Sequence, residues 1–524
     1  MKTIPRHSDY QNDEVSIWDG QDGTIWVAGE RHGLVIYKPD SDIHFVCGRD
    51  EGLANNALLT ILPDNEGNIW LGSDGGGLTR IRPRSIMSYG YEAGLEQTLV
   101  NAIIEISPGQ MLVGTHGGGV VPFDGTRFGA PLSIGVLNDQ SWVQALQADS
   151  GGAIWLGTYG DGLVYLKGNE YQNFRWGDIR ARHIYSLHLD SRGRLWIGTE
   201  RGVGSLDDRV LTSWFDIRPK EDGRIIDILE DGNGHIWAAT HLGVLFRQSG
   251  EGFVRQETLS GLEMGEVKGM YYDATVGFWI SSQSQELFHL IDNRWIRYGP
   301  EHGIPAGKWS PSLTDERGDL WLTSERGILR ITRASLLAVA AGKSDTVDCQ
   351  IFDKRDGMIT SAGRQDFPDS GLRTSDGKLW FTTLKGIVSI NSETIRITPQ
   401  IPQVHIEQVR DGDEPLASSV QPGDVVIVKA GTERVNIRYG GTVLSYGENT
   451  HFSYRLEGVD EDWVNAGVEP VARLSSLEPG DYLFRVRAMS IEGKVGRESS
   501  VLLRIEPFWW QLWSVRIAGI GLLV

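Results

Sequence analysis

The sequence predicts an all-β protein whose main part is a seven-bladed β-propeller. A motif centred on one tryptophan recurs at intervals of about 41 to 44 residues through most of the chain. Glycine is abundant, at 66 of 524 residues, as many tight strand connections require. Repeats of this length with one aromatic residue each are typical of four-stranded propeller blades. After the last repeat the period disappears, and alternating strands predict an immunoglobulin-like β-sandwich.

The repeat is clearest in residues 190–199, which follow the pattern D-x-x-G-x-[I/L]-W-x-[G/A]-[T/S]. The pattern returns, with small departures, around eight tryptophans: Trp26, Trp70, Trp155, Trp196, Trp237, Trp279, Trp321 and Trp380. A ninth copy, at Gln110–Thr115, lacks the tryptophan. A lone blade cannot bury both of its faces, so these copies must stack side by side.

Each position of the repeat has a physical role. We expect Asp190 to cap its own turn and Gly193 to adopt a positive φ, as a tight connection between strands needs. Trp196 alternates with its neighbours across the sheet and can wedge between adjacent blades. Gly198 leaves room where blades crowd together near the axis.

The repeats divide unequally. Residues 1–84 hold two of them, and residues 85–400 hold seven, a common number for ring closure. After the last repeat, Gly386–Ile390 gives a third strand but no clear fourth one follows. We predict that Ser85–Tyr89 supplies that fourth strand and closes the ring. The first two repeats are then the last blades of a preceding, truncated propeller.

The longer step from Trp321 to Trp380 has its own explanation. Ser335–Ala341, followed by Gly342, predicts a short helix inserted before the last blade. Beyond it, residues 401–506 contain alternating runs such as Val425–Val428 and Tyr482–Arg487, separated by Pro-Gly turns. These runs define the sandwich.

The repeats resemble the two-component regulator propeller family. Within the sandwich, Tyr454–Gly458 with Trp463, and Leu477–Tyr482 with the strand that follows, resemble the triple-tyrosine (Y_Y_Y) domain. One departure is Leu474, where that domain usually has a tyrosine. The resemblance implies a ligand-binding sensor in the periplasm, part of a homodimeric bacterial receptor of the inner membrane. Its implied ligands include oligosaccharides, and its implied outputs are a histidine kinase or a diguanylate cyclase.

The two ends of the sequence lead to further expectations. The first residues lack the apolar core of a signal peptide. Residues 507–524 begin with an aromatic cluster, Phe508–Trp513, such as lies at a membrane interface. Val515–Val524 then turns apolar, which we interpret as the start of a transmembrane helix. A C-terminal strand or an amphipathic tail is the alternative.

Composition limits the function. The formal net charge of −19 argues against nucleic acid as a partner. The two cysteines, Cys47 and Cys349, are interpreted as separate buried thiols. The sequence contains none of the common metalloprotease, nucleotide-binding or serine-hydrolase motifs. We therefore assign no catalytic residue, metal ligand or cofactor.

A ligand site is predicted instead at the axial mouth of the ring. The segments that lead into each innermost strand converge there, so side chains one repeat apart become neighbours. Six basic or aromatic residues occupy these segments: Trp142, Arg182, Arg224, Lys268, Trp309 and Arg364. Aromatic rings stack on sugars and arginine forks bind carboxylate or sulfate, so this set favours an acidic oligosaccharide. The alternatives are a propeller enzyme such as a polysaccharide lyase, a protein-interaction scaffold, or ordinary solvated loops.

Overall fold

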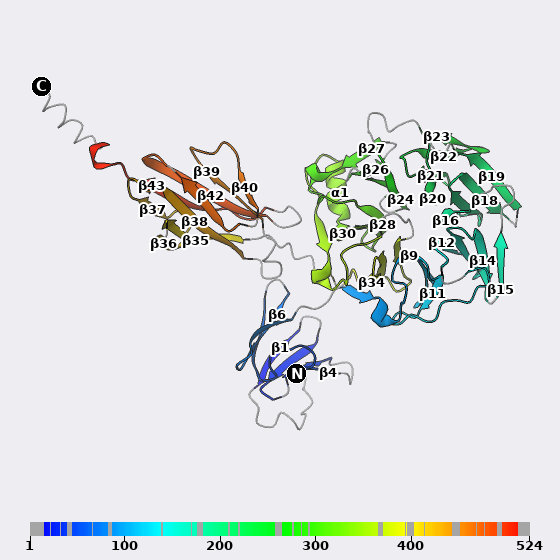
Figure 1. Ribbon diagram of the computed structural model, residues 1–524, viewed down its shortest axis with the longest axis horizontal. Coiled ribbons are helices and arrows are strands. Elements are labelled where there is room, and N and C mark those ends of the chain that lie inside the picture. Colours follow the sequence, from blue (N-terminus) through cyan, green and yellow to red (C-terminus); the bar gives the residue numbers. More distant parts are fainter. Residues whose placement is uncertain are drawn as a thin grey trace. The chain divides into compact units, whose positions relative to one another are not determined.

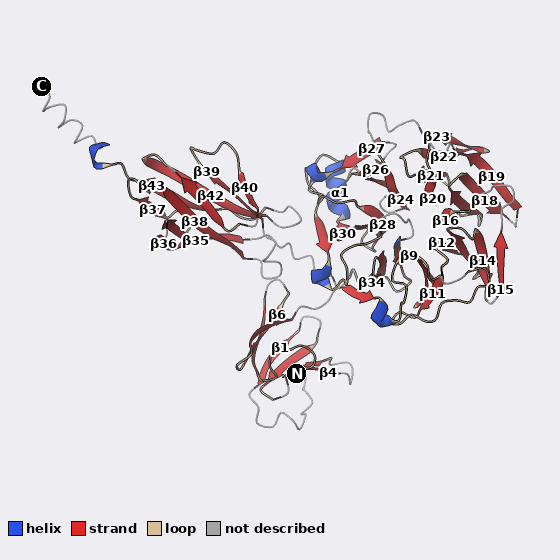
Figure 2. Cartoon of the chain, viewed as in Figure 1, coloured by secondary structure: helices blue, strands red, loops and turns tan. Residues whose placement is uncertain are grey.

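A computed structural model of the chain shows an all-β protein, as the sequence predicts (Figures 1 and 2). The residues it describes are 15–20, 23–31, 33–38, 44–64, 67–81, 86–137, 140–168, 170–174, 182–207, 210–217, 221–256, 265–274, 277–283, 286–291, 294–364, 370–393, 395, 403–412, 414–442, 451–467, 469–475, 477–489 and 495–511. The chain divides into two compact units. One contains the ring, Ser85–Arg396, and the other contains Met1–Arg84 and the sandwich.

Seven antiparallel sheets, numbered here as blades 1 to 7, form the ring (Figure 1). Blades 1 and 2 consist of β9 (Val100–Ser107), β10 (Gln110–Thr115) and β11 (Val120–Phe123), and of β12 (Val143–Ala148), β13 (Ile154–Thr158), β14 (Leu163–Lys167) and β15 (Glu170–Phe174). Blades 3 and 4 consist of β16 (Ile184–Leu189), β17 (Leu195–Thr199), β18 (Gly202–Asp207) and β19 (Val210–Asp216), and of β20 (Ile225–Glu230), β21 (Ile236–Thr240), β22 (Leu245–Ser249) and β23 (Gly252–Arg255). Blades 5, 6 and 7 consist of β24 (Val267–Asp273), β25 (Gly277–Ser282), β26 (Leu287–Ile291) and β27 (Arg294–Tyr298); of β28 (Ser310–Thr314), β29 (Leu320–Ser324), β30 (Gly327–Ile331) and β31 (Cys349–Phe352); and of β32 (Gly371–Arg373), β33 (Leu379–Thr383), β34 (Gly386–Ile390) and β8 (Ile86–Tyr89). The first strand of each blade contacts the first strands of its two neighbours, and β32 contacts β9. The ring is therefore closed.

Closure depends on a strand from the start of the ring. β8 pairs antiparallel with β34, Ile86 opposite Ile390, so it is the fourth strand of blade 7, as the sequence predicts. Ile86 is fully buried, and Tyr89 packs on Trp380 with 5.6 Å between ring centroids. The ring is thus held shut by segments about 300 residues apart in sequence.

The Asp of the repeat motif fixes both the turn and the tryptophan through hydrogen bonds. In blade 3, Oδ1 of Asp190 accepts the backbone N–H groups of Arg192 and Arg194 at 3.0 and 2.8 Å. Oδ2 of Asp190 accepts the indole N–H of Trp196 at 2.8 Å. Gly193 has a φ of 82°, which confirms the left-handed turn. The same indole bond joins Asp64 to Trp70, Asp231 to Trp237, Asp315 to Trp321 and, with a hydroxyl acceptor, Thr374 to Trp380.

The tryptophan held by this hydrogen bond packs between blades. Trp196 is 1% exposed and lies in a core with Ile225 and Ile228 of blade 4. A Cβ on Gly198 would stand 2.8 Å from Cγ2 of Ile225, so this glycine permits the close approach of the next blade. The expected roles of Trp196 and Gly198 are therefore confirmed.

The inserted helix, α1 (Arg333–Ala340), begins two residues earlier than predicted and precedes the last strand of blade 6. Gly342 follows it with a φ of 66°. Leu336 of α1 is 1% exposed, and its carbonyl oxygen accepts a hydrogen bond from the Tyr298 hydroxyl at 3.1 Å. The helix thereby joins blade 6 to blade 5. Short 3₁₀ helices occur at η2 (Tyr91–Ala93), η3 (Pro300–His302) and η4 (Lys354–Asp356).

The first two repeats also form blades. Their strands are β1 (Val15–Asp19), β2 (Ile25–Gly29), β3 (Gly33–Tyr37) and β4 (His44–Cys47) in one sheet, and β5 (Leu58–Pro63), β6 (Ile69–Ser73) and β7 (Gly77–Ile81) in the other. They share a core that contains Trp26, Leu58 and Leu71. Cys47 and Cys349 are both free thiols, as expected, but only Cys349 is buried, since Cys47 lies in an outer strand and is partly exposed.

The C-terminal sheets form a sandwich with one core. One sheet has the order β36 (Glu414–Val420), β35 (Gln403–Asp411), β38 (Arg434–Thr442), β41 (Val471–Ser475); the other has the order β37 (Val425–Val428), β43 (Ser499–Ile505), β42 (Gly480–Met489), β39 (His451–Leu456), β40 (Val464–Gly467). Tyr439 and Phe484 are fully buried between them. Leu474, the departure from the tyrosine pattern, packs in the same core.

The last described element of the chain is η7 (Trp509–Gln511). The predicted start of a membrane helix at Val515–Val524 lies outside the described residues. Within the part of the chain that the structure describes, no helix has the length and apolar character needed to span a bilayer.

The closure strand provides a matched test, because its side chains alternate between core and solvent. Replacing the buried Ile86 with Ala should lower the stability of the ring by about 2–4 kcal/mol, since it leaves a cavity beside blade 7. Met87→Ala, at a position 49% exposed, should change it by less than about 0.5 kcal/mol. Denaturant unfolding monitored by tryptophan fluorescence measures both. Equal effects would contradict closure by β8.

The spacing between blades is tested at two glycines. Gly198→Ala should destabilise the protein by about 1–3 kcal/mol, because the new methyl group overlaps Ile225. Gly252→Ala is the control, since Gly252 lies in an outer strand with no other atom within 4 Å of the added carbon. Thermal unfolding of the two variants should therefore differ. A Gly198→Ala variant as stable as the control would show that the blades can separate freely at this position.

Candidate functional site

The predicted mouth is built where two parts of each repeat meet. Between blades 1 and 2 and between blades 2 and 3, the residue after the second strand of one blade pairs with the segment that leads into the first strand of the next. His116 forms such a bridge with Trp142, and Tyr159 forms one with His183. We call the residues that gather here the rim: Trp142, Arg182, His183, Tyr185, Arg224, Lys268 and Arg364 from the first-strand segments, and His116, Tyr159, Glu200 and His241 from the ends of second strands.

Four rim rings form a continuous stack across blades 1 to 3. His116 lies 3.7 Å from Trp142 with an interplanar angle of 28°. Trp142 lies 5.2 Å from Tyr159 at 30°, and Tyr159 lies 3.8 Å from His183 at 17°. Trp142 and Tyr159 are therefore each stacked between two neighbouring rings, while Tyr159 is still 41% exposed. Trp142 lies in the rim, and its edge rather than its faces is left open.

Arg224 extends this arrangement to blade 4. Its guanidinium lies over the ring of Tyr185, 5.1 Å from the centroid, and its backbone N–H donates to Nδ1 of His241 at 3.0 Å. Burial raises the pKa of Tyr185 to about 12, so its hydroxyl stays protonated. Burial, followed by the charge of Arg224, lowers the pKa of His241. The His241 imidazole is therefore neutral at pH 7.

Arg364 continues the rim in the other direction, from blade 7 to blade 1. Its Nη2 donates to Oδ1 of Asn101 at 2.6 Å, and Nδ2 of Asn101 donates to the carbonyl oxygen of Val143 at 2.9 Å. Asn101 is fully buried, so Arg364 is held by a rigid partner. Burial lowers the pKa of His116, and the nearby charge of Arg364 lowers it further.

The remaining predicted cations lie beside carboxylates. Arg182 is exposed, and the backbone N–H groups of Arg182 and His183 donate to Glu200 at 2.9 and 3.1 Å. Nζ of Lys268 lies 3.5 Å from Glu266. The rim therefore mixes both signs of charge, which sequence reasoning from basic residues alone did not anticipate.

Trp309 is a correction to the predicted site. It precedes β28 at the position that Trp142 holds before β12, but its side chain is only 1% exposed. Its indole N–H donates to the carbonyl oxygen of Pro305 at 2.6 Å, and the ring packs in a core with Leu336. The loop before β28 folds over the ring, so Trp309 has no face on which a ligand could stack.

Sequence reasoning missed the residues at the ends of the second strands. In each repeat this is the residue directly after the motif's Thr or Ser, and the seven are His116, Tyr159, Glu200, His241, Gln283, Glu325 and Leu384. The motif itself contained the signal, because it fixes this position in every copy. Across the described residues, no group of three or more His, Cys, Asp or Glu side chains is placed to hold a metal ion.

The rim is suited to hydrogen bonding and charge recognition. The stack places two imidazoles, an indole and a phenol next to one another in one row, and the Nδ1 atoms of His116 and His183 are buried in it. Arg224 and Arg364 stand at or beyond the two ends of that row. Mutual stacking holds the rings in place, so little side-chain freedom remains to be lost on binding.

Family models match two parts of the chain. The two-component regulator propeller model matches residues 52–75 and 178–201, and the Y_Y_Y domain model matches residues 443–506. No curated protein matches the chain.

Similar solved structures include extracellular domains of putative hybrid two-component systems from B. thetaiotaomicron. That of BT3049 is 19% identical, with a TM-score of 0.70, and the match covers 94% of this chain and 68% of the other. That of BT4673 is 16% identical with a TM-score of 0.47, and covers 96% and 70%. The chain thus contains two-component regulator propeller repeats followed by a Y_Y_Y domain.

Proposed function

We propose that this chain is the ligand-sensing, extracytoplasmic region of a bacterial two-component receptor, placed in the periplasm. The observation that carries the proposal is the row of stacked aromatic rings, flanked by arginines, that spans the rim from blade 7 to blade 4. The order of propeller repeats and Y_Y_Y domain supports it, since it matches the family of sensors. The rim is the site at which we place the ligand.

The chemistry of the rim favours an anionic, hydroxyl-rich ligand such as an acidic oligosaccharide. Hydroxyl groups can exchange hydrogen bonds with the indole, imidazole and phenol edges, and carboxylate or sulfate matches the arginine forks. Sugar stacking on Trp142 is not part of this proposal, because His116 and Tyr159 cover both of its faces. Ligand recognition is then through edges and charges.

Signal relay completes the proposed function. A ligand can alter signalling only by binding two states of the receptor with different affinity. We place these states in the arrangement of two protomers of a homodimer, joined through the sandwich to an inner-membrane helix and an output domain. A histidine kinase or a diguanylate cyclase would serve as that output.

Two rim arginines test the ligand site. Arg182→Ala and Arg224→Ala should each weaken binding of an acidic oligosaccharide, found by glycan-array screening, by about 1 kcal/mol, because exposed charges are partly screened. Calorimetry measures the change. Arg192→Ala, an exposed arginine in the turn at the opposite end of blade 3, should leave affinity unchanged. Unchanged affinity in all three variants would move the site away from the rim, and turnover of the oligosaccharide would favour an enzyme.

The lowered pKa values of His116 and His241 predict a pH dependence. Both imidazoles are neutral at pH 7 and gain a proton as the pH falls through their lowered pKa values. The added charge lies beside Arg364 and Arg224, so binding of a sulfated oligosaccharide, whose own charge is constant, should strengthen several-fold between pH 7 and pH 5. His116→Gln should reduce this slope. Affinity that is flat with pH in both proteins would contradict a role for these rings.

A further inference from the structure

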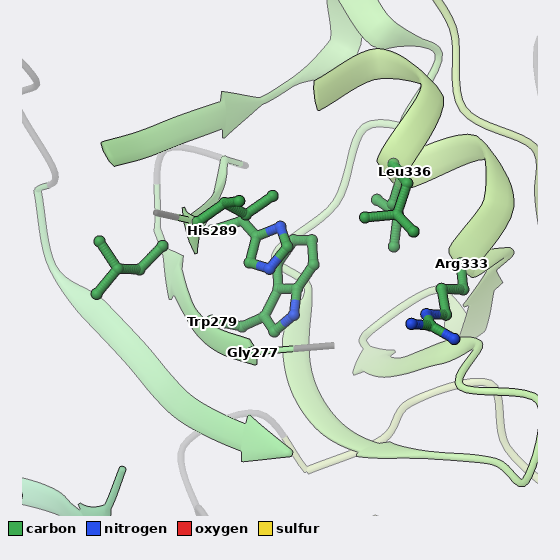
Figure 3. Close-up of a pocket in the computed structure, with 8 residues that line it drawn as sticks. Gly277, Trp279, His289, Arg333 and Leu336 are labelled. Atoms are coloured by element: carbon green, nitrogen blue, oxygen red, sulfur yellow. The ribbon is translucent and has the colours of Figure 1, made fainter. Parts of the chain in front are cut away.

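A cavity lies away from the rim, between blade 5 and the inserted helix α1 (Figure 3). Its volume is about 210 Å³, and its walls come from β25, β26 and α1. Gly277, at the start of β25, lines it, whereas the rim lies beyond Ser282 at the other end of that strand. The cavity is therefore a separate feature of the ring.

Most of the cavity wall is apolar or aromatic. His289 lies flat against Trp279, with 3.8 Å between centroids and an interplanar angle of 12°. Leu336 faces this pair from α1, as Figure 3 shows, and Ile291 and the partly exposed Leu337 extend the apolar lining. The helix is anchored here by the Tyr298 hydroxyl and by Asp319, whose Oδ1 accepts the backbone N–H at its first residue at 2.9 Å.

One positively charged side chain, that of Arg333, lies at this apolar wall. Among the described residues that line the cavity, Arg333 is the only Lys, Arg, Asp or Glu. Its Nε is buried, and its guanidinium has no hydrogen bond or ion pair within the described parts of the chain. Figure 3 shows that group turned toward the side of the cavity where Trp279 lies. Neighbouring arginines differ: Arg330 bonds Asp319, and Arg297 bonds Glu286 and Glu301.

We propose that this cavity binds a monocarboxylate with an apolar body about the size of one ring. A cavity of about 150 Å³ lined by apolar groups is large enough for benzene, so 210 Å³ also holds a small acidic group. Arginine binds carboxylate through two parallel hydrogen bonds, which would use the donors of Arg333 that have no other partner. A single cation beside apolar walls selects one negative charge, and it disfavours a phosphate dianion or a sugar.

The test uses the full chain with sodium benzoate as the probe and benzyl alcohol as its neutral analogue. Saturation-transfer NMR and calorimetry should show benzoate binding, and benzyl alcohol binding at least tenfold more weakly. Arg333→Gln should weaken benzoate about tenfold or more, because it removes a charge-assisted pair. Leu337→Trp, which fills the cavity from an exposed position, should weaken both compounds.

Two controls separate this cavity from other cationic surfaces. Arg192→Gln changes an exposed arginine in blade 3, and Arg224→Ala changes the rim; both should leave benzoate affinity unchanged. Absence of saturable benzoate binding at millimolar concentrations would overturn the proposal. So would binding that survives Leu337→Trp or depends on Arg224. Equal affinity for benzoate and benzyl alcohol would refute the role assigned to Arg333.

Discussion

The structure depends on one carboxylate that recurs, in several blades, in the turn between the first two strands. In blade 3 one oxygen of Asp190 holds the turn and the other holds the indole N–H of Trp196. The tryptophan is then fixed in one orientation, and its buried N–H is satisfied, which avoids a cost of about 1–3 kcal/mol. Because the indole ring of Trp196 packs against the next blade, a local hydrogen bond sets the spacing between blades.

The same repeat fixes the rim. The second strand ends in a Thr whose hydroxyl bonds the turn that follows: Thr115 to Gly119, Thr158 to Gly162 and Thr199 to Gly202. The next residue is free to vary in type yet is held at a constant place beside the following blade. His116, Tyr159 and His241 use that position. A rigid scaffold thus presents a row of variable side chains, an arrangement common in binding proteins.

Sequence periodicity predicted the blades, the closing strand β8 and the inserted helix, because each follows from local spacing and from the need to bury two faces. The rim was predicted only in part. Trp142 and Trp309 occupy the same position in their repeats, yet the first lies at the rim and the second is buried. The difference comes from the loop before β28, whose path is not periodic. The stacking of aromatic rings from separate blades could likewise not be predicted from the sequence, since it depends on tertiary contacts.

Mutual stacking has a consequence for how the rim can work. A ring with both faces covered cannot stack on a sugar unless its neighbours move, and His116, Trp142, Tyr159 and His183 come from three adjacent blades. Recognition through the ring edges needs no such movement, because stacking already holds the rings in place. Rigid aromatic partners also lose little entropy on binding, whereas the exposed Arg182 and Arg224 must be ordered by the ligand. The stack therefore fixes the direction of hydrogen bonds to a ligand, and the arginines select for negative charge.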